Sequence, residues 1–187
     1  TGNTTSAISV SFESIKCSNI KVSVTFVEHS IDREHEHLCD TWVNYIHIPL
    51  VDGVFNKSMC QNFGALYSNA VSYYMFHDAD VLVQNTFFTK AMENLKKGFD
   101  AMQSFTNRRL LYCDQTTSTE IICGRTDANA LNENSKCVTV GGVGAQGGSM
   151  IVARDVFYNV GGYEDFFTEY SVEDADFFER LKIMSRL

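Results

Sequence analysis

The sequence has a single proline, no Cys-x-x-Cys pair, no excess of basic residues and no long apolar run. One proline excludes a collagen-like or polyproline chain. Six scattered cysteines in 187 residues are too few for a disulfide scaffold, so we expect free thiols. No apolar run approaches the roughly 18 residues that a spanning helix needs, and we therefore expect no membrane segment in this chain.

Acidic residues outnumber basic ones, 23 against 15, which leaves a formal net charge of −8. A chain with this balance lacks the positive groove that neutralises nucleic-acid phosphates, so we expect no nucleic-acid partner. A phosphorylated substrate would need a bridging cation. The length and the 44% of hydrophobic residues predict one globular domain spanning residues 1–187.

Apolar periodicity and turn residues predict an alternation of helices and strands. The expected helices cover residues 4–17, 57–70, 86–97, 155–159 and 173–187, and the expected strands cover 20–27, 42–50, an apolar run within 73–83, and 149–152. Residues 124–148 are expected to form a polar and then glycine-rich connector. This order predicts α/β layers with a largely parallel central sheet.

Asp78 and Asp80 stand where an apolar run ends. Strand alternation would place both carboxylates on one side of the backbone, where they repel each other unless a cation lies between them. Mn²⁺ and Mg²⁺ prefer oxygen ligands and would bridge the pair to a diphosphate. An exposed turn with helix-capping aspartates explains the same pair without a metal.

Acidic residues also begin the last expected helix, as Glu173, Asp174 and Asp176. The helix dipole alone favours acids there, but a carboxylate beside apolar groups also suits a general base. Glycines cluster between Gly141 and Gly148. They permit close backbone approach to a ligand or form a plain flexible loop, and they match neither a Walker loop nor a dinucleotide fingerprint.

Seven short segments follow one another along the chain in an order that is typical of a known enzyme fold. They are Val27-Glu28-His29-Ser30, Phe55-Asn56-Lys57-Ser58, Asn62-Phe63-Gly64, His77-Asp78-Ala79-Asp80, Gly147-Gly148-Ser149, Gly161-Gly162-Tyr163 and Glu173-Asp174. Together they resemble glycosyltransferases of the GT-A fold over about residues 20–182. Residues 55–83 resemble the β-1,4-galactosyltransferase pattern, and residues 147–180 are similar to that family and to family 2 inverting glycosyltransferases, in which a Gly-Gly-Tyr/Phe turn precedes a Glu-Asp pair and an arginine.

The resemblance implies a GT-A (nucleotide-diphospho-sugar transferase) fold and a metal-dependent donor site. Asp80 would ligate Mn²⁺ or Mg²⁺ directly, and Asp78 would contact the ribose or the metal through water. Glu28 would lie near the nucleotide base. Gly147 and Gly148 would lie beside the donor sugar or the acceptor.

The resemblance also implies inverting transfer from a UDP-sugar to a glycan or glycoconjugate hydroxyl. Asp174 would be the general base, and Glu173 would hold sugar hydroxyls. Residues 166–171 stand where the galactosyltransferases have a tryptophan-rich acceptor loop, so the acceptor is not implied. We further expect the first strand of the fold and its C-terminal metal-ligating segment to lie outside this chain.

Three other functions fit some of the same residues. A retaining GT-A enzyme of the N-acetylgalactosaminyltransferase type shares the Gly-Gly-Tyr turn, and a nucleotidyltransferase also uses paired aspartates with Mg²⁺. In a non-catalytic carbohydrate-binding module the acids would be structural. With no anchor in view, the sequence favours a cytoplasmic enzyme, with a Golgi-lumen catalytic domain as the alternative.

Overall fold

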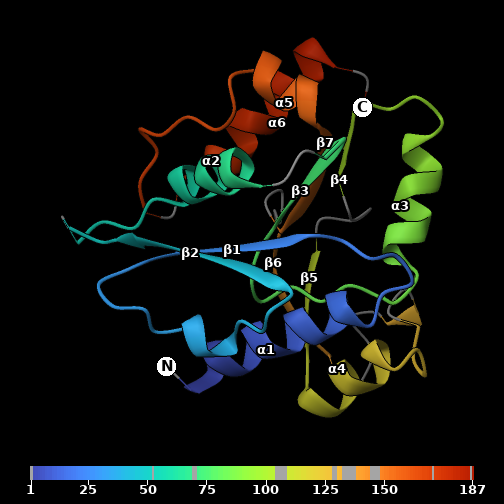
Figure 1. The fold of residues 1–187 in the computed structure, drawn as a ribbon. Helices are drawn as coiled ribbons and strands as arrows, with labels where there is room; N and C mark the ends of the chain where they lie inside the picture. Colours follow the sequence, from blue (N-terminus) through green and yellow to red (C-terminus); the bar gives the residue numbers. More distant parts are fainter. Residues whose placement is uncertain are drawn as a thin grey trace. The chain divides into compact units, whose positions relative to one another are not determined.

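Helices and strands alternate along most of the chain (Figure 1). The computed structural model describes residues 2–51, 53–68, 71–103, 109–127, 130–131, 138–143, 148–169, 171–185 and 187. The helices are α1 (Gly2–Lys16), the short 3₁₀ helix η1 (Glu36–Leu38), α2 (Lys57–Tyr67), α3 (Phe87–Leu95), α4 (Gln115–Ile122), α5 (Arg154–Asn159) and α6 (Glu173–Met184). The strands are β1 (Val24–Ser30), β2 (Val43–Pro49), β3 (Tyr73–His77), β4 (Ala101–Gln103), β5 (Arg109–Cys113), β6 (Val138–Val143) and β7 (Ser149–Ala153).

Most of the expected elements are confirmed. The bounds of α1, α2, α3, α5, α6, β2 and β7 lie within three residues of the expected ones. β1 is a correction, because it runs over Val24–Ser30 and not over 20–27. The strand continues through the polar Glu28, which pairs in register with His47 of β2. Glu28 is tolerated within the strand because hydrogen bonds, described below, satisfy its carboxylate.

The expected connector over 124–148 is partly wrong. Its described end contains β6, which pairs antiparallel with β5. Val138, Thr139 and Val140 are β-branched residues that favour a strand, and a partner at residues 109–113 supplies the ladder. Neither β4, β5 nor α4 was expected from the sequence.

The sheets give a mixed α/β architecture. β1 and β2 form a parallel pair, β5 and β6 form a separate antiparallel pair, and a three-stranded sheet has the order β3–β7–β4. The expected α/β class is therefore confirmed. A largely parallel central sheet and the assignment to the GT-A fold stay predictions.

The chain divides into two compact units, each described by itself. The first contains Thr1–Val22, His77–Gly98 and Gln103–Ser149, and the second contains Ser23–Phe76, Phe99–Met102 and Met150–Leu187. In the first unit, Ile8, Phe12 and Ile15 form the buried face of α1, as their helical spacing predicts. The buried Ser14 hydroxyl donates to the Ser11 carbonyl and accepts from the Val83 amide, so this polar group is satisfied.

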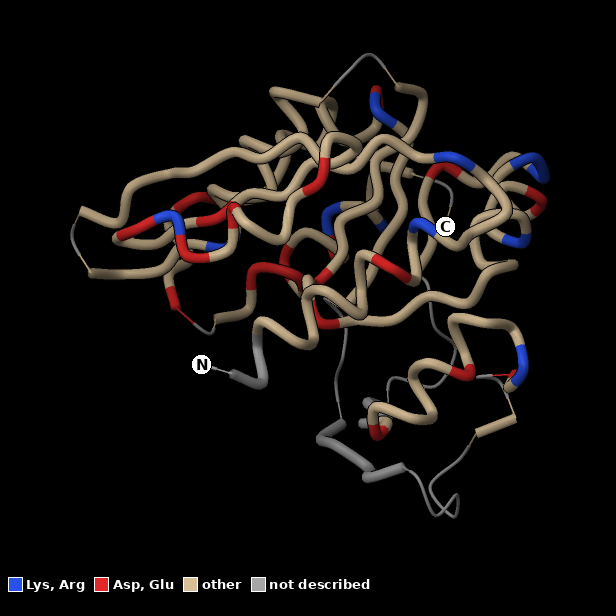
Figure 2. The backbone as a smooth tube through the Cα atoms, turned by 60° about the horizontal axis from the view of Figure 1, so that its bottom comes forward, with Lys and Arg blue, Asp and Glu red and all other residues tan. Residues whose placement is uncertain are grey.

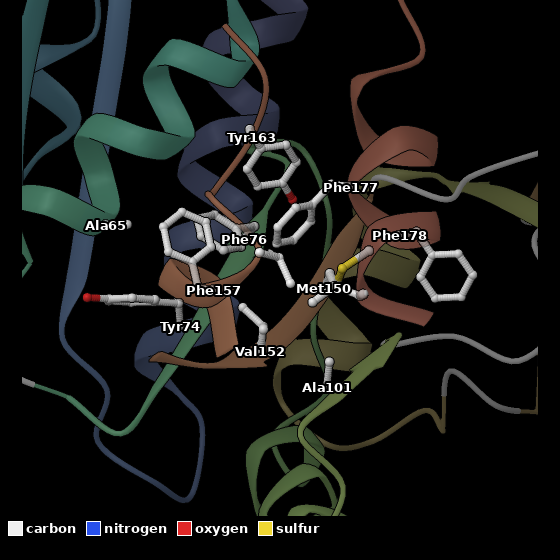
Figure 3. Packing of buried hydrophobic residues seen from close by; sticks show 12 residues of the cluster. Ala65, Tyr74, Phe76, Ala101, Met150, Val152, Phe157, Tyr163, Phe177 and Phe178 are labelled. Carbon is white, nitrogen blue, oxygen red and sulfur yellow. The ribbon is translucent and has the colours of Figure 1, made fainter. Parts of the chain in front are cut away.

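An aromatic core organises the second unit. Figure 3 shows the rings of Phe76, Phe157, Tyr163 and Phe177 gathered together, with Phe76 and Phe157 centroids 5.0 Å apart and Tyr163 and Phe177 stacked at 4.1 Å. Full burial of one such side chain contributes about 1.5–3 kcal/mol. The rings come from β3, α5, α6 and the turn between these two helices, so the core fixes where α6 begins.

The apolar face of α6 is confirmed in part. Phe177 and Leu181 are fully buried and Phe178 is buried. Helical spacing predicts Met184 on the same apolar face, and this prediction is wrong, because Met184 is 57% exposed. α6 ends at this residue.

Candidate functional site

The first turn of α6 brings Glu173 and Asp174 to the start of α2. Lys57, the first residue of α2, places its Nζ 2.8 Å from Asp174 Oδ2 and 3.8 Å from Glu173 Oε1. The side chains are 9% exposed for Glu173, 15% for Asp174 and 23% for Lys57. The sequence therefore forms a half-buried cluster of two carboxylates and one ammonium within the second unit.

Burial makes this cluster electrostatically unusual. Burial raises the pKa of Glu173, the negative charge of Asp174 raises it further, and Lys57 opposes both effects. Glu173 Oε2 and Asp174 Oδ1 are buried without a hydrogen-bond partner among the described residues. Leaving such acceptors unsatisfied costs about 1–3 kcal/mol each in a folded protein, so the arrangement is not explained by stability.

The turn at Gly161-Gly162-Tyr163 is held from two sides. Asn62 of α2 donates from Nδ2 to the Tyr163 carbonyl at 2.8 Å and accepts from the Tyr163 amide at 2.9 Å. Arg180 of α6 donates to the carbonyls of Val160 and Gly162, each at 2.7 Å. Gly162 has φ +70°, and a Cβ there would lie 2.8 Å from Asn62 Oδ1, so the turn requires glycine.

Asn56 connects the same region to the loop before α6. Its Oδ1 accepts from the Met59 amide and caps α2, while its Nδ2 donates to the Asp165 carbonyl at 2.7 Å. The Glu169 amide donates to the Phe55 carbonyl at 2.9 Å. The motifs around residues 56, 62, 162 and 180 thus position the two helices that carry the acidic pair and Lys57.

Glu28 forms a different cluster near the end of β1. Its buried carboxylate accepts hydrogen bonds from the amides of Glu34 and His35, from His35 Nδ1 and from the Tyr45 hydroxyl. Burial raises the pKa of Glu28, but these hydrogen bonds outweigh it and hold the pKa below its ordinary value. Glu28 therefore ties the loop after β1 to the sheet.

Asp78 and Asp80 lie in the first unit, directly after β3. The strand ends at His77, and the backbone then turns, with the Asp78 amide donating to the Gly148 carbonyl at 3.0 Å and the Val81 amide donating to the Asp78 carbonyl at 3.1 Å. The expectation that strand alternation aligns the two carboxylates is wrong, because both residues lie beyond the strand. Asp80 is exposed and Asp78 is half-buried.

His77 braces this turn. Its Nε2 donates to the Val81 carbonyl at 3.0 Å. Burial lowers the pKa of His77 to about 4, although the hydrogen bond to Val81 and the charge of Asp80 act in the opposite direction. The ring is therefore neutral near pH 7, and the turn that carries Asp80 does not depend on a protonated histidine.

A hard divalent cation fits the Asp78–Asp80 turn by its donor type. Asp80 offers an exposed carboxylate, which Mg²⁺ or Mn²⁺ can bind while keeping waters or diphosphate oxygens as its other ligands. Among the described residues, no group of three or more His, Cys, Asp or Glu side chains forms a complete metal site. A cation at this turn would therefore require oxygens from a ligand.

The structure brings together some of the expected site residues. Glu173 and Asp174 are neighbours around Lys57, and Asp78 pairs with Gly148 through the backbone. Glu28 belongs to its own hydrogen-bonded cluster, and Gly147 lies outside the described residues.

Sequence reasoning gave no role to Lys57, Asn62 or Arg180. A signal for Lys57 was present, because a cation in the first turn of a helix opposes the helix dipole. Acidic and basic positions are interspersed along the described backbone (Figure 2). The charge around a given carboxylate therefore depends on which basic side chain lies next to it, as Lys57 does for the acidic pair.

Three further findings lie outside this site. In the ranges that the structure describes, no helix has both the length and the apolar character needed to cross a membrane. Among the described cysteines, Cys17, Cys39, Cys60 and Cys123 are free thiols. No protein-family model matches the sequence, and no curated protein matches it significantly.

Proposed function

We propose that this chain is a metal-dependent glycosyltransferase of the GT-A type that moves a sugar from a UDP-sugar to a glycan or glycoconjugate hydroxyl with inversion. The observation that carries the proposal is the acidic pair at the start of α6. Glu173 and Asp174 are kept from water beside one lysine, and each retains a buried oxygen without a partner among the described residues. A buried carboxylate with a perturbed pKa, as Glu173 has, is typical of functional sites.

Asp174 takes the role of general base in this proposal. Its Oδ2 accepts from Lys57, and its Oδ1 is buried without a hydrogen-bond partner among the described residues, so Oδ1 would be the atom that accepts the proton. Transfer would begin with an acceptor hydroxyl hydrogen-bonded to this carboxylate. Glu173, which is more deeply buried, would hydrogen-bond a sugar hydroxyl.

The motif residues around the pair support the proposal. Asn62 and Arg180 hold the Gly161-Gly162-Tyr163 turn, and Asn56 fixes the loop that leads into α6. These residues belong to the short segments on which the glycosyltransferase resemblance depends. Their side chains serve to position α2 and α6, which is the expected use of a motif that prepares a catalytic carboxylate.

Asp78 and Asp80 would hold the divalent cation of the donor. Mn²⁺ or Mg²⁺, when bound, would neutralise charge that develops on the leaving diphosphate. The exposure of Asp80 at the end of β3 leaves its carboxylate free to meet such a ligand, and the backbone pairing of Asp78 with Gly148 keeps the turn in place. Gly147 and Gly148 would then lie beside the donor sugar, as the resemblance implies.

Calorimetric titration with UDP, GDP and CMP, each with and without Mn²⁺, tests the donor half of the proposal. We expect UDP to bind in a Mn²⁺-dependent manner and the other nucleotides to bind more weakly. Incubation with UDP-sugars and a panel of glycan acceptors tests the transfer half. The proposal fails if no nucleotide binds with Mn²⁺ and no nucleotide-sugar is consumed, an outcome that would favour a non-catalytic module.

A further inference from the structure

Lys57 occupies a position that helix stability does not explain. It is the first residue of α2, after the Asn56 cap, and a positive charge at a helix N-terminus is unfavourable because it opposes the helix dipole. Its ammonium group contacts the two acids at the start of α6. Asp174, the nearer of the two, lies 117 residues away in the sequence. The position is therefore explained by the acidic pair and not by α2.

The contact is asymmetric between the two carboxylates. Lys57 Nζ lies 2.8 Å from Asp174 Oδ2 but 3.8 Å from Glu173 Oε1. One cation thus serves two acids and sits at hydrogen-bond distance from only one of them. Asp174 keeps its second oxygen, Oδ1, buried and without a partner among the described residues.

The deeply buried acid supplies an independent observation. Glu173 is more than nine-tenths buried, and its Oε2 has no hydrogen-bond partner within the described ranges. A buried acceptor left unsatisfied beside a paired carboxylate indicates that a ligand hydroxyl completes the cluster.

We propose that Lys57 is a positioning residue for the acidic pair: it holds Asp174 by Oδ2 and so makes Asp174 Oδ1, rather than Glu173, the group that takes the acceptor proton. This inference rests on the proposed function. In the transfer step the acceptor hydroxyl proton moves to Asp174 Oδ1, and the acceptor oxygen forms a bond to the anomeric carbon. The bond from that carbon to the diphosphate oxygen breaks, and the nucleoside diphosphate leaves with the electron pair.

The charges that face the pair agree with this division. Burial raises the pKa of Glu173 first, and Asp174 on the same helix raises it further, whereas Lys57 from α2 lowers it. The nearby Asp176 is paired with Arg180 at 2.8 Å.

The test compares Lys57→Met, Lys57→Arg and wild type in a transfer assay from pH 5 to 9 with saturating donor. For Lys57→Met we expect kcat at pH 7 to fall about 10- to 100-fold, with KM changed less than about threefold. The acid limb of the kcat profile should move to higher pH, because the acidic pair loses the cation that favours its ionised form. Lys57→Arg should restore the wild-type limb. Lys182→Met, which removes an exposed lysine of α6, is the matched control.

The outcomes separate the two proposals. If wild type transfers sugar but Lys57→Met keeps the wild-type acid limb, the inference about Lys57 is overturned and the proposed function stands. If wild type consumes no nucleotide-sugar, the proposed function fails, and the role of Lys57 fails with it. Thermal unfolding checks that each variant folds. If Lys57→Met does not fold, Lys57→Gln, which keeps a hydrogen-bond donor without the charge, replaces it, and the same shift of the acid limb is expected.

Discussion

The chain has two short acidic motifs of similar composition, and they lie in opposite surroundings. Asp78-Ala79-Asp80 forms an exposed turn after β3, whereas Glu173-Asp174-Ala175-Asp176 forms the first turn of α6 against the aromatic core. On α6, charges of the protein itself meet the acids, through Lys57 and Arg180. Asp80, by contrast, is exposed to solvent and is available to an external cation.

The difference shows that the burial and the ion pairing of a carboxylate, and not the presence of acidic residues in the sequence, determine what it can do. A carboxylate that is largely kept from water and held by a lysine suits proton transfer. A carboxylate exposed to water is cheap to maintain and suits a hydrated metal ion. The two motifs should therefore respond to mutation in opposite ways.

Asp174→Asn is the substitution with the largest expected effect. Asparagine keeps the shape of the side chain but cannot accept a proton as a carboxylate does, so we expect sugar transfer to fall by about 10²- to 10⁴-fold. Binding of UDP with Mn²⁺ should remain within about twofold of wild type. Steady-state transfer rates and calorimetric titration measure the two quantities.

The matched control is Glu179→Gln, which removes an exposed acid of the same helix. It should leave both transfer and binding unchanged. If Asp174→Asn transfers sugar at the wild-type rate, Asp174 is not the base. The first turn of α6 would then be a buried acidic cluster without the proton-accepting role that we propose for it.

Phe177→Ala tests whether the core holds the acidic pair in place. Phe177 is fully buried and stacks on Tyr163, so truncation should lower the free energy of unfolding by about 3–5 kcal/mol. Phe166→Ala removes a ring that is 72% exposed and should change stability by less than about 0.5 kcal/mol. Urea denaturation measures both, and equal effects would contradict the packing described for α6.

Every α-helix except α4, and the strands β1, β2, β3 and β7, could be predicted because their apolar residues repeat at the period of the element. Ile8, Phe12 and Ile15 mark α1, and Phe177, Phe178 and Leu181 mark α6, and all of them are buried. The α6 acids could also be singled out, since acidic residues at a helix start are a visible pattern. Their environment could not, because Lys57 lies more than a hundred residues away.

The failures have the same cause, which is pairing between distant segments. β6 was taken for part of a connector because its partner strand β5 was not recognised. Glu28 marked a false end of β1, since the loop amides and Tyr45 that satisfy its charge were not visible in the strand itself. The shared side of Asp78 and Asp80 was inferred from a strand that ends one residue earlier, at His77.

Asp80→Ala should give the reverse of the Asp174 result. Because Asp80 is exposed, we expect stability to change by less than about 0.5 kcal/mol. Affinity for UDP in the presence of Mn²⁺ should fall at least about tenfold, as expected when a ligand of a hard cation is removed. Glu93→Ala, at an exposed acid of α3, is the control. Unchanged Mn²⁺-dependent binding by Asp80→Ala would remove the metal from the Asp80 turn.

Glu173→Gln has the smallest expected effect and examines the buried side of the comparison. Burial raises the pKa of Glu173, so the folded chain holds this proton more tightly than the unfolded chain does. Wild type therefore loses stability as the pH rises from the ordinary glutamate pKa through the raised one, and the full penalty is present above that window. Glutamine does not ionise, so the variant should gain stability relative to wild type at pH 7.5, by about 1 kcal/mol, and gain less at pH 4.5. Urea unfolding of both chains at the two pH values measures this difference. An equal difference at both pH values would show that the charge of Glu173 is not what distinguishes the start of α6 from the Asp80 turn.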